Sequence, residues 1–255
     1  MPPSARRMWA RIAREEFGAQ EDRSTAMRFH TQTAGVSLTA QQPENNIVRT
    51  AYQALAAVLG GTQSLHTNSM DETLSLPTEK AVKIALRTQQ VLAEETEVAN
   101  VIDPLAGSYF IEAQTNRLEE QAEAYFREIE ERGGVGAAIE SGFMQSEIHR
   151  SAVKYQRAVE SGAKRVVGVN CYVEEGEGPP EIDIHRIDPA VEQEQHARLA
   201  SLRETRDADA AVAALGAVRS ACGDGSNLQE RFVAAAHAGC TLGEIAEVLR
   251  EEFDA

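Results

Sequence analysis

The sequence has 255 residues, a formal net charge of −15 and three cysteines. So acidic a chain is repelled by a phosphate backbone, which argues against nucleic acid as a partner. No apolar run is long enough to cross a membrane, and the N-terminus lacks the apolar core of a signal peptide. Cys171, Cys222 and Cys240 form no C-x-x-C pair, which indicates reduced thiols in a cytoplasmic protein rather than a disulfide framework or a zinc site.

Short strands alternate with amphipathic helices in the first part of the chain. Strands are predicted at 27–31 and 62–65, with a third, weaker one at 101–103. Such alternation is typical of a parallel sheet covered by helices. About three strand–helix units are visible, so we expect an α/β fold that forms the later part of a (β/α)8 TIM barrel. Apolar residues at helical spacing predict helices at 6–17, 46–59, 77–95 and 116–132.

The second part of the chain has a different pattern. A helix at 144–163 and a short strand at 165–169 precede an acidic segment rich in glycine and proline, 174–180, which is typical of a linker. Three or four helices follow, and Thr241 and Glu244 fit a capping box at the start of the last one. We therefore expect a barrel part at 1–164 and, at 165–255, a linker strand with a helical extension.

Two polar stretches end the first two predicted strands. They read "RFHTQTAGVSLTAQQ" and "TQSLHTNSMDETLSLP", and barrel enzymes place their functional groups at such strand ends. Strand alternation puts His30 and Gln32 on one face, and Gln63 and Leu65 on one face of the next strand. The stretches could line a lumen that accepts a polar, extended ligand, or they could form a self-satisfied network of buried side chains.

The histidines in these stretches allow two interpretations. His30 and His66 could act as general acids or donate to a carbonyl, or they could simply be hydrogen-bonded parts of the strands. No pair of histidines has the spacing of a metal site, so we expect no metal.

The polar stretches, read with their flanks, resemble a known family. The carrying motifs are "RFHTQTAGVSLTAQQPENNIVRTA", "LGGTQSLHTNSMDETLSLPTEKAVKIALRTQQ", "DPLAGSYFIE" and "VVGVN", and similarity continues to "CTLGEIAEVL". The chain resembles the large subunit of the adenosylcobalamin-dependent acyl-CoA mutases, the methylmalonyl-CoA mutase family, over nearly its whole length. The resemblance implies a barrel that threads the pantetheine arm of coenzyme A through a polar centre, with adenosylcobalamin held mainly by a separate domain or subunit.

The resemblance also implies roles for individual residues. The residues that match acyl-CoA contacts are His30, Gln32, Gln63 and Ser64. The residues that match cofactor contacts are Gly35 and Val36 beside the corrin, Glu72 at the adenosyl ribose, and Ser75 and Leu76. About five strand–helix units, with the main catalytic residues, are expected upstream of Met1. "DIHRID", at 183–188, begins like the D-x-H-x-x-G signature of cobalamin-binding domains, but Asp188 replaces its glycine, and we interpret the match as chance.

The expected reaction is the radical rearrangement of (R)-methylmalonyl-CoA to succinyl-CoA. Val36 stands where many methylmalonyl-CoA mutases have tryptophan, and Ala106 stands where glycine is usual. The form "FHTQTAGVSLT" is closer to the archaeal-type mutases and to isobutyryl- and 2-hydroxyisobutyryl-CoA mutases. Expected partners are an acyl-CoA, a cobalamin-binding subunit and an N-terminal half-barrel chain, with no nucleic acid or membrane. Two other functions stay open: a non-catalytic assembly module of a mutase complex, and a small enzyme that uses His30 or His66. The isolated chain is expected neither to turn over methylmalonyl-CoA nor to bind adenosylcobalamin tightly.

Overall fold

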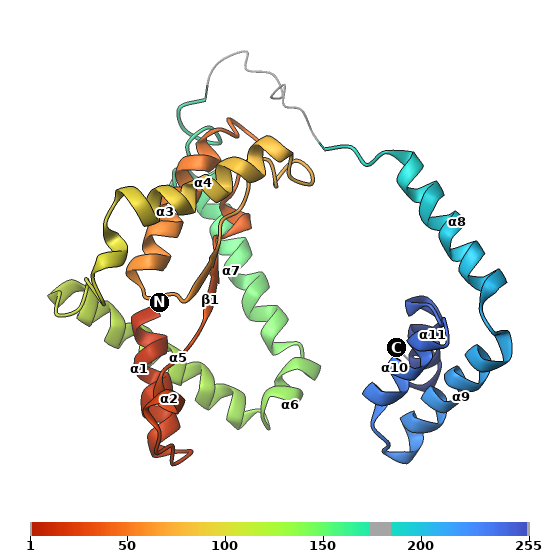
Figure 1. Cartoon of the computed structure of the whole chain (residues 1–255). Coiled ribbons are helices and arrows are strands. Elements are labelled where there is room, and N and C mark those ends of the chain that lie inside the picture. Colours follow the sequence, from red (N-terminus) through yellow and green to blue (C-terminus); the bar gives the residue numbers. More distant parts are fainter. Residues whose placement is uncertain (1, 174–184, 254–255) are drawn as a thin grey trace. The chain divides into compact units, whose positions relative to one another are not determined.

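The computed structural model describes residues 2–173 and 185–253 (Figure 1). The chain forms two compact units, Met1–His185 and Arg186–Ala255, which we call unit 1 and unit 2. This division lies later than the expected boundary after residue 164, and that boundary stays a prediction. The expected linker at 174–180 and the start of "DIHRID" lie outside the described residues.

A βαβ element forms the centre of unit 1. β1 (His30–Gln32) pairs in parallel with β2 (Ser64–His66), and α3 (Asn45–Leu59) connects them. This confirms the first two predicted strands and their parallel pairing. Both strands start later than predicted. For β2 the reason is the turn after α3, where Gly61 has a φ of +82°, a value that L-residues rarely adopt.

Helices surround this strand pair in unit 1. α3 packs against α4 (Glu79–Glu95), and both helices bury small residues: Ala54 and Ala81 have no exposed surface. α1 (Pro2–Glu15) lies along α5 (Tyr109–Glu131), as Figure 1 shows. The four predicted helices of this region are confirmed. The remaining elements of unit 1 are α2 (Asp22–Thr25), the 3-10 turns η1 (Gly35–Ser37) and η2 (Val98–Asn100), α6 (Val135–Glu140) and α7 (Phe143–Glu160).

The other two predicted strands of unit 1 are wrong. Residues 101–107 form bends and turns, and Asp103 has a φ of 51°, which interrupts an extended chain. Residues 165–169 form a turn with a single bridge between Val167 and Cys171. There the Asn170 side chain accepts a hydrogen bond from the Val166 N–H at 2.7 Å. Both segments are apolar, which favoured a strand. Among the described residues, however, neither lies beside a strand with which it could form a ladder of hydrogen bonds.

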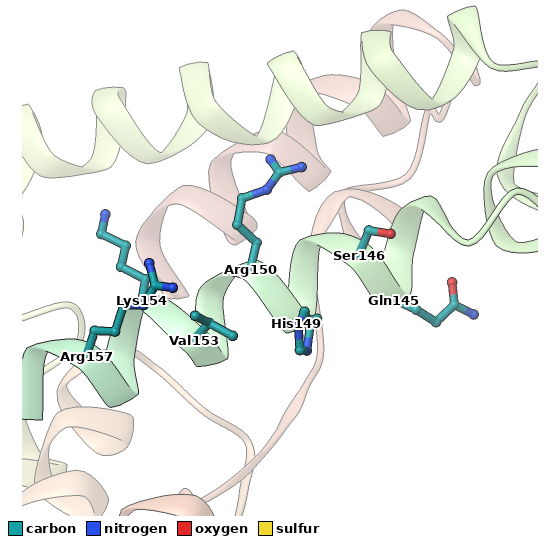
Figure 2. A pocket seen from close by; sticks show the side chains of 7 residues that line it. All are labelled: Gln145, Ser146, His149, Arg150, Val153, Lys154 and Arg157. Atoms are coloured by element: carbon teal, nitrogen blue, oxygen red, sulfur yellow. The ribbon is translucent and has the colours of Figure 1, made fainter. Parts of the chain in front are cut away.

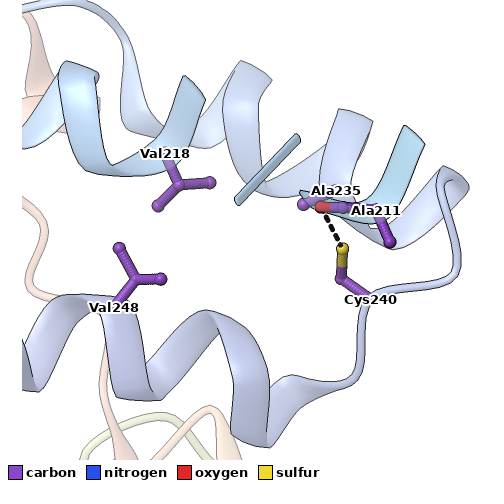
Figure 3. Close-up of a cluster of buried hydrophobic side chains, with 5 residues drawn as sticks. All are labelled: Ala211, Val218, Ala235, Cys240 and Val248. Atoms are coloured by element: carbon purple, nitrogen blue, oxygen red, sulfur yellow. Dashed lines mark hydrogen bonds between the residues drawn. The ribbon is translucent and has the colours of Figure 1, made fainter. Parts of the chain in front are cut away.

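Unit 2 consists of helices, as expected. α9 (Ala208–Asp224), α10 (Leu228–His237) and α11 (Leu242–Phe253) pack around a small apolar core (Figure 3). The predicted capping box is confirmed, because Thr241 Oγ1 accepts from the Glu244 N–H at 3.2 Å and Glu244 Oε2 accepts from the Thr241 N–H at 2.8 Å. α8 (Pro189–Thr205) precedes these helices in the chain.

Candidate functional site

The paired strands bring the predicted substrate residues together. His30 lies opposite Ser64 and Gln32 opposite His66 in the register, and His30 Nδ1 is 2.7 Å from Ser64 Oγ. All four side chains are exposed, and strand alternation places them on one face. The expected common face of His30 and Gln32 is therefore confirmed, and Ser64 joins them on it, whereas their contact with an acyl-CoA stays a prediction.

Gln63 differs from the other predicted substrate residues. It precedes β2 and has the opposite parity to Ser64, so alternation directs it away from that face. Its Oε1 accepts from the Phe29 N–H at 2.8 Å, and its Nε2 donates to the Gly61 carbonyl at 2.8 Å. In this structure the Gln63 amide therefore fastens the start of the strand pair, and its role at a substrate stays a prediction.

Asn68 connects the loop after β1 with the loop after β2. Its Oδ1 accepts from Thr33 Oγ1 at 2.6 Å, and its backbone N–H donates to the same hydroxyl at 2.9 Å. Its Nδ2 donates to Glu72 Oε2, while Glu72 Oε1 accepts from the Ser69 N–H at 2.6 Å. A Cβ on Gly35 would lie 3.5 Å from Asn68 Nδ2. The structure thus brings two predicted cofactor residues, Gly35 and Glu72, to the same asparagine.

Asn46 makes a second connection between these loops. Its side chain is fully buried and forms four hydrogen bonds. Oδ1 accepts from the Thr39 N–H at 3.0 Å and from Arg49 Nη1 at 2.8 Å, and Nδ2 donates to the carbonyls of Thr39 and Met70, both at 2.9 Å. Arg49 Nη2 also donates to the Val167 carbonyl at 2.7 Å. One helix side chain therefore fixes the loop after β1 to the loop after β2.

Asp71 anchors the second loop to α4. Its Oδ2 accepts from both the N–H and the Oγ1 of Thr78, at 2.9 and 2.8 Å, and Thr78 is the N-cap of α4 through a hydrogen bond from the Ala81 N–H. The other carboxylate oxygen of this fully buried residue has no hydrogen-bond partner among the described residues. The loop that carries Glu72 is thereby held at both ends.

The remaining predicted cofactor residues are on the outside of these loops. Val36 is 95% exposed and Leu76 is 57% exposed, so both offer apolar surface to a large ligand. Ser75 Oγ donates to the Leu76 carbonyl at 2.9 Å, and no hydrogen bond joins Ser75 to Glu72 among the described residues. The contact of these residues with a cofactor stays a prediction.

A hollow in the surface runs along α7. Its lining includes His149, Arg150, Lys154 and Arg157, and Figure 2 shows the side chains of His149 and Arg150 diverging from the helix. Arg150 already pairs with Glu147 at 2.6 Å. All the lining residues come from one helix, so they converge on no common point that would define a site.

Within the described part of the chain, no three side chains among histidine, cysteine, aspartate and glutamate are placed to hold a metal ion. In the same part, no helix has both the length and the apolar character needed to cross a membrane. The expected cytoplasmic location stays a prediction.

Sequence reasoning missed Asn46 and Asn68. Both asparagines lie inside the motifs "PENNIV" and "LHTNSMDE", but burial of each amide depends on the distance between two loops. Asn68 lies four residues before Glu72, and this spacing is the only local signal that could have indicated their contact.

A parallel strand pair connected by a helix and packed among further helices agrees with the expected α/β fold. The family model for methylmalonyl-CoA mutase matches residues 3–255, and the chain belongs to that family. It is 45% identical to the methylmalonyl-CoA mutase of Escherichia coli and 43% identical to a probable mitochondrial methylmalonyl-CoA mutase of Caenorhabditis elegans. In both comparisons 98% of the chain is covered.

The chain spans about a third of the length of these two relatives, 35% and 34%. It is also 44% identical to the 2-hydroxyisobutanoyl-CoA mutase large subunit of Aquincola tertiaricarbonis, over 96% of the chain and 44% of that relative. Relatives named as mutases of two different acyl-CoAs are therefore similar to this chain to nearly the same degree.

Proposed function

We propose that this chain forms part of an adenosylcobalamin-dependent acyl-CoA mutase, an isomerase, as the later strand–helix units of a (β/α)8 barrel. The observation that supports this most directly is the His30–Ser64 register, which gathers exposed polar side chains on one face of a parallel strand pair. Branched apolar side chains usually fill that position in a barrel. Polar ones support a lumen occupied by the pantetheine arm of an acyl-CoA.

The proposed substrate is (R)-methylmalonyl-CoA, with succinyl-CoA as the product. Isobutyryl-CoA and 2-hydroxyisobutyryl-CoA are the alternatives, and the similarity to a 2-hydroxyisobutanoyl-CoA mutase large subunit favours the second of them. The proposed partners are a cobalamin-binding domain or subunit and a chain that supplies the N-terminal half of the barrel. A relative named as a large subunit supports assembly from more than one chain.

The chain's own residues would bind and orient the reactants. His30, Gln32 and Ser64 offer donors and acceptors to the acyl-CoA arm. Bound adenosylcobalamin supplies the radical chemistry. Glu72 would accept hydrogen bonds from the adenosyl ribose, because each carboxylate oxygen uses one donor here and has capacity for another. Asn68 fixes the direction of that carboxylate, while Gly35, Val36, Ser75 and Leu76 would lie along the rest of the cofactor.

Glu72→Gln tests this role in an enzyme assembled with a half-barrel chain and a cobalamin-binding subunit. The substitution keeps the size but removes the charge from the acceptor, and hydrogen bonds to charged groups are the stronger ones. We expect turnover to fall about tenfold, which corresponds to about 1.4 kcal/mol of transition-state stabilisation. The affinity for the acyl-CoA should change little.

Glu79→Gln is the matched control, because Glu79 is an exposed acid in the first turn of α4. If Glu72 only complements the positive N-terminus of that helix, both variants should lose a few tenths of a kcal/mol of stability and no activity. Thermal unfolding is measured together with turnover. A lower unfolding temperature indicates a destabilised loop, whereas lower turnover at unchanged stability indicates a lost contact in the site. Full turnover by Glu72→Gln would exclude Glu72 from the site.

A further inference from the structure

Thr33 follows β1 directly, and its side chain is on the buried side of the strand pair. Its backbone N–H donates to the His66 carbonyl at 3.1 Å, which extends the pairing of the two strands by one bond. Strand alternation places its side chain on the opposite face from His30 and Gln32. In agreement, Thr33 is 5% exposed, whereas the other two residues are exposed. The sheet therefore fixes the position of a buried hydroxyl group.

This hydroxyl makes two hydrogen bonds with one neighbour, Asn68. The oxygen accepts from the Asn68 backbone N–H at 2.9 Å, and the hydroxyl proton is donated to Asn68 Oδ1 at 2.6 Å. Because a hydroxyl has a single proton to donate, these two bonds use it for the oxygen of the side-chain amide. Asn68 is itself 4% exposed, so its amide is held by protein groups with little competition from water.

The orientation of the Asn68 amide determines what Glu72 meets. With Oδ1 at Thr33, the amide presents Nδ2 to Glu72, and Nδ2 donates to Glu72 Oε2. The Ser69 N–H donates to the other oxygen, Oε1, at 2.6 Å. An ionised carboxylate is an acceptor only, so Nδ2 stabilises it and Oδ1 would repel it. One donor on each oxygen restricts rotation of the carboxylate, which the Ser69 N–H alone does not do.

We propose that Thr33 is a positioning residue: its hydroxyl holds the Asn68 amide in the orientation in which Nδ2 fixes the carboxylate of Glu72. This rests on the proposed function, in which Glu72 accepts hydrogen bonds from a ribose. Thr33 acts through Asn68 and contacts no ligand itself, because its side chain is buried. A small displacement of an orienting group lowers the rate of a reaction more than it lowers the binding of the substrate.

A purely structural role for Thr33 is the alternative. Its hydroxyl satisfies a buried backbone N–H, and the loss of such a partner destabilises a fold whatever the site does. A fall in stability therefore does not distinguish the two roles. They differ in two properties that stability does not report: the hold on the Asn68 side-chain amide, and the dependence of any loss of turnover on the charge of Glu72.

The first property is measured on the full chain, without cofactor, as the exchange of the Asn68 side-chain amide protons followed by NMR. Asn68→Asp removes the signal and so assigns it. Thr33→Val keeps the shape of the side chain but removes the hydroxyl, and it should speed this exchange about tenfold or more. Thr33→Ser keeps the hydroxyl and should restore slow exchange. Thr33→Cys, whose thiol is a weak donor, is a milder variant that should give an intermediate rate.

Thr50→Val is the matched control for this exchange. Thr50 is 2% exposed, and its hydroxyl donates to the Asn68 backbone carbonyl at 3.5 Å. The substitution therefore removes a buried threonine hydroxyl beside the same residue without removing a bond to its side-chain amide. It should leave the exchange of the Asn68 amide protons within about twofold of the unsubstituted chain.

The second property is measured as turnover in the enzyme assembled with a half-barrel chain and a cobalamin-binding subunit. Thr33→Val should lower kcat about fivefold and leave the KM for the acyl-CoA unchanged. In a Glu72→Gln background it should lower kcat by less than about twofold, because glutamine can donate to the amide as well as accept from it. The loss of thermal stability should be similar in both backgrounds.

Slow exchange of the Asn68 amide in both Thr33→Val and Thr33→Cys would overturn the proposal, and so would fast exchange in Thr33→Ser. Equal falls in kcat with and without Glu72→Gln would assign Thr33 a purely structural role. Full turnover by Glu72→Gln alone is a separate outcome that contradicts the proposed function of Glu72. Fast exchange in Thr33→Val would then still show that the hydroxyl holds the amide, because that measurement needs neither cofactor nor turnover.

Discussion

The loops of unit 1 and the helices of unit 2 are stabilised in opposite ways. Around the candidate site most of the buried residues are polar: Asn46 and Asp71 are fully buried, and Thr33, Thr67 and Asn68 are nearly so. The core of unit 2 is apolar, and the one side-chain hydrogen bond marked between the five residues drawn in Figure 3 is a weak one at 3.5 Å from Cys240 Sγ to the Ala211 carbonyl.

This difference matches what each region has to achieve. Apolar burial is non-directional and holds helices together without fixing individual atoms. Hydrogen bonds are directional, and a fully satisfied buried network specifies one arrangement of the groups that it joins. Asn46 and Asn68 each join the loop after β1 to the loop after β2, so the positions of Gly35 and Glu72 depend on polar contacts. The cost of losing one partner should therefore be larger here than in unit 2.

Asn46→Ala should give the largest effect in the chain. It removes four hydrogen bonds, including those to the half-buried N–H and carbonyl of Thr39 and to the buried Met70 carbonyl. Each unsatisfied buried group costs about 1–3 kcal/mol, so we expect unit 1 to lose on the order of 3–5 kcal/mol. Urea unfolding followed by the fluorescence of Trp9, the single tryptophan, measures this loss because Trp9 belongs to unit 1.

The neighbouring Asn45→Ala is the control for that substitution. Asn45 is only half-buried, and among the described residues its side chain donates one hydrogen bond, to Gln42 Oε1 at 3.0 Å. Its loss should cost less than about 1 kcal/mol. Equal effects of the two substitutions would contradict the view that the polar network fixes the loops.

Sequence reasoning was accurate where local periodicity determines the structure. The helices α3, α4 and α11 follow from apolar spacing and end signals such as Thr241 and Glu244. It failed for the expected strands at 101–103 and 165–169, because a strand also needs a neighbour to pair with, and local composition does not report one. Positive φ at Asp103 and Gly168 shows turns there instead.

The candidate site was predictable only in part, for a similar reason. The interpretation as a network of buried polar side chains is confirmed for Thr33, Thr67 and Asn68, whose side chains are buried and hydrogen-bonded. His30 and Gln32 are exposed on one face, and the lumen that they were expected to line stays a prediction. Alternation within a strand predicted that face. The partners of Asn68 lie on two loops whose approach depends on tertiary structure, so the sequence alone could not assign it.

Val218→Ala should give a smaller effect, confined to unit 2. Val218 has no exposed surface, and loss of two methyl groups should cost about 1–2 kcal/mol in transfer and cavity terms. The change should appear in unfolding followed by far-ultraviolet circular dichroism and not in the Trp9 signal. Val212→Ala, at a residue 70% exposed on the same helix, should have almost no effect. A shift of the Trp9 transition by Val218→Ala would show that the two units do not unfold independently.

The smallest effect should be a pH dependence in unit 2. Both oxygens of Glu244 accept from Arg206 at 2.7 Å, and chiefly because of this hydrogen-bonded pair the pKa of Glu244 falls from 4.5 to about 2. A carboxyl group whose pKa is lower in the folded state stabilises the fold above its unfolded pKa, and this contribution is lost as the pH falls from about 4.5 towards 2. Since the side chain is 24% exposed, solvent screening reduces the contribution to about 1 kcal/mol.

Glu244→Gln should therefore lower the stability of unit 2 at pH 6, and its difference from the unsubstituted chain should shrink as the pH approaches 2. The other carboxylates titrate equally in both chains, so their contribution to the pH dependence of stability cancels in this comparison. Glu247→Gln serves as the control, because Glu247 pairs with Arg250 on the surface with 61% of its side chain exposed, and such pairs contribute little. A Glu244→Gln difference that stays constant from pH 6 to 2.5 would mean that the charge of Glu244 does not stabilise the fold. The Thr241 capping bonds, which a glutamine can partly retain, would then be what holds the start of this helix.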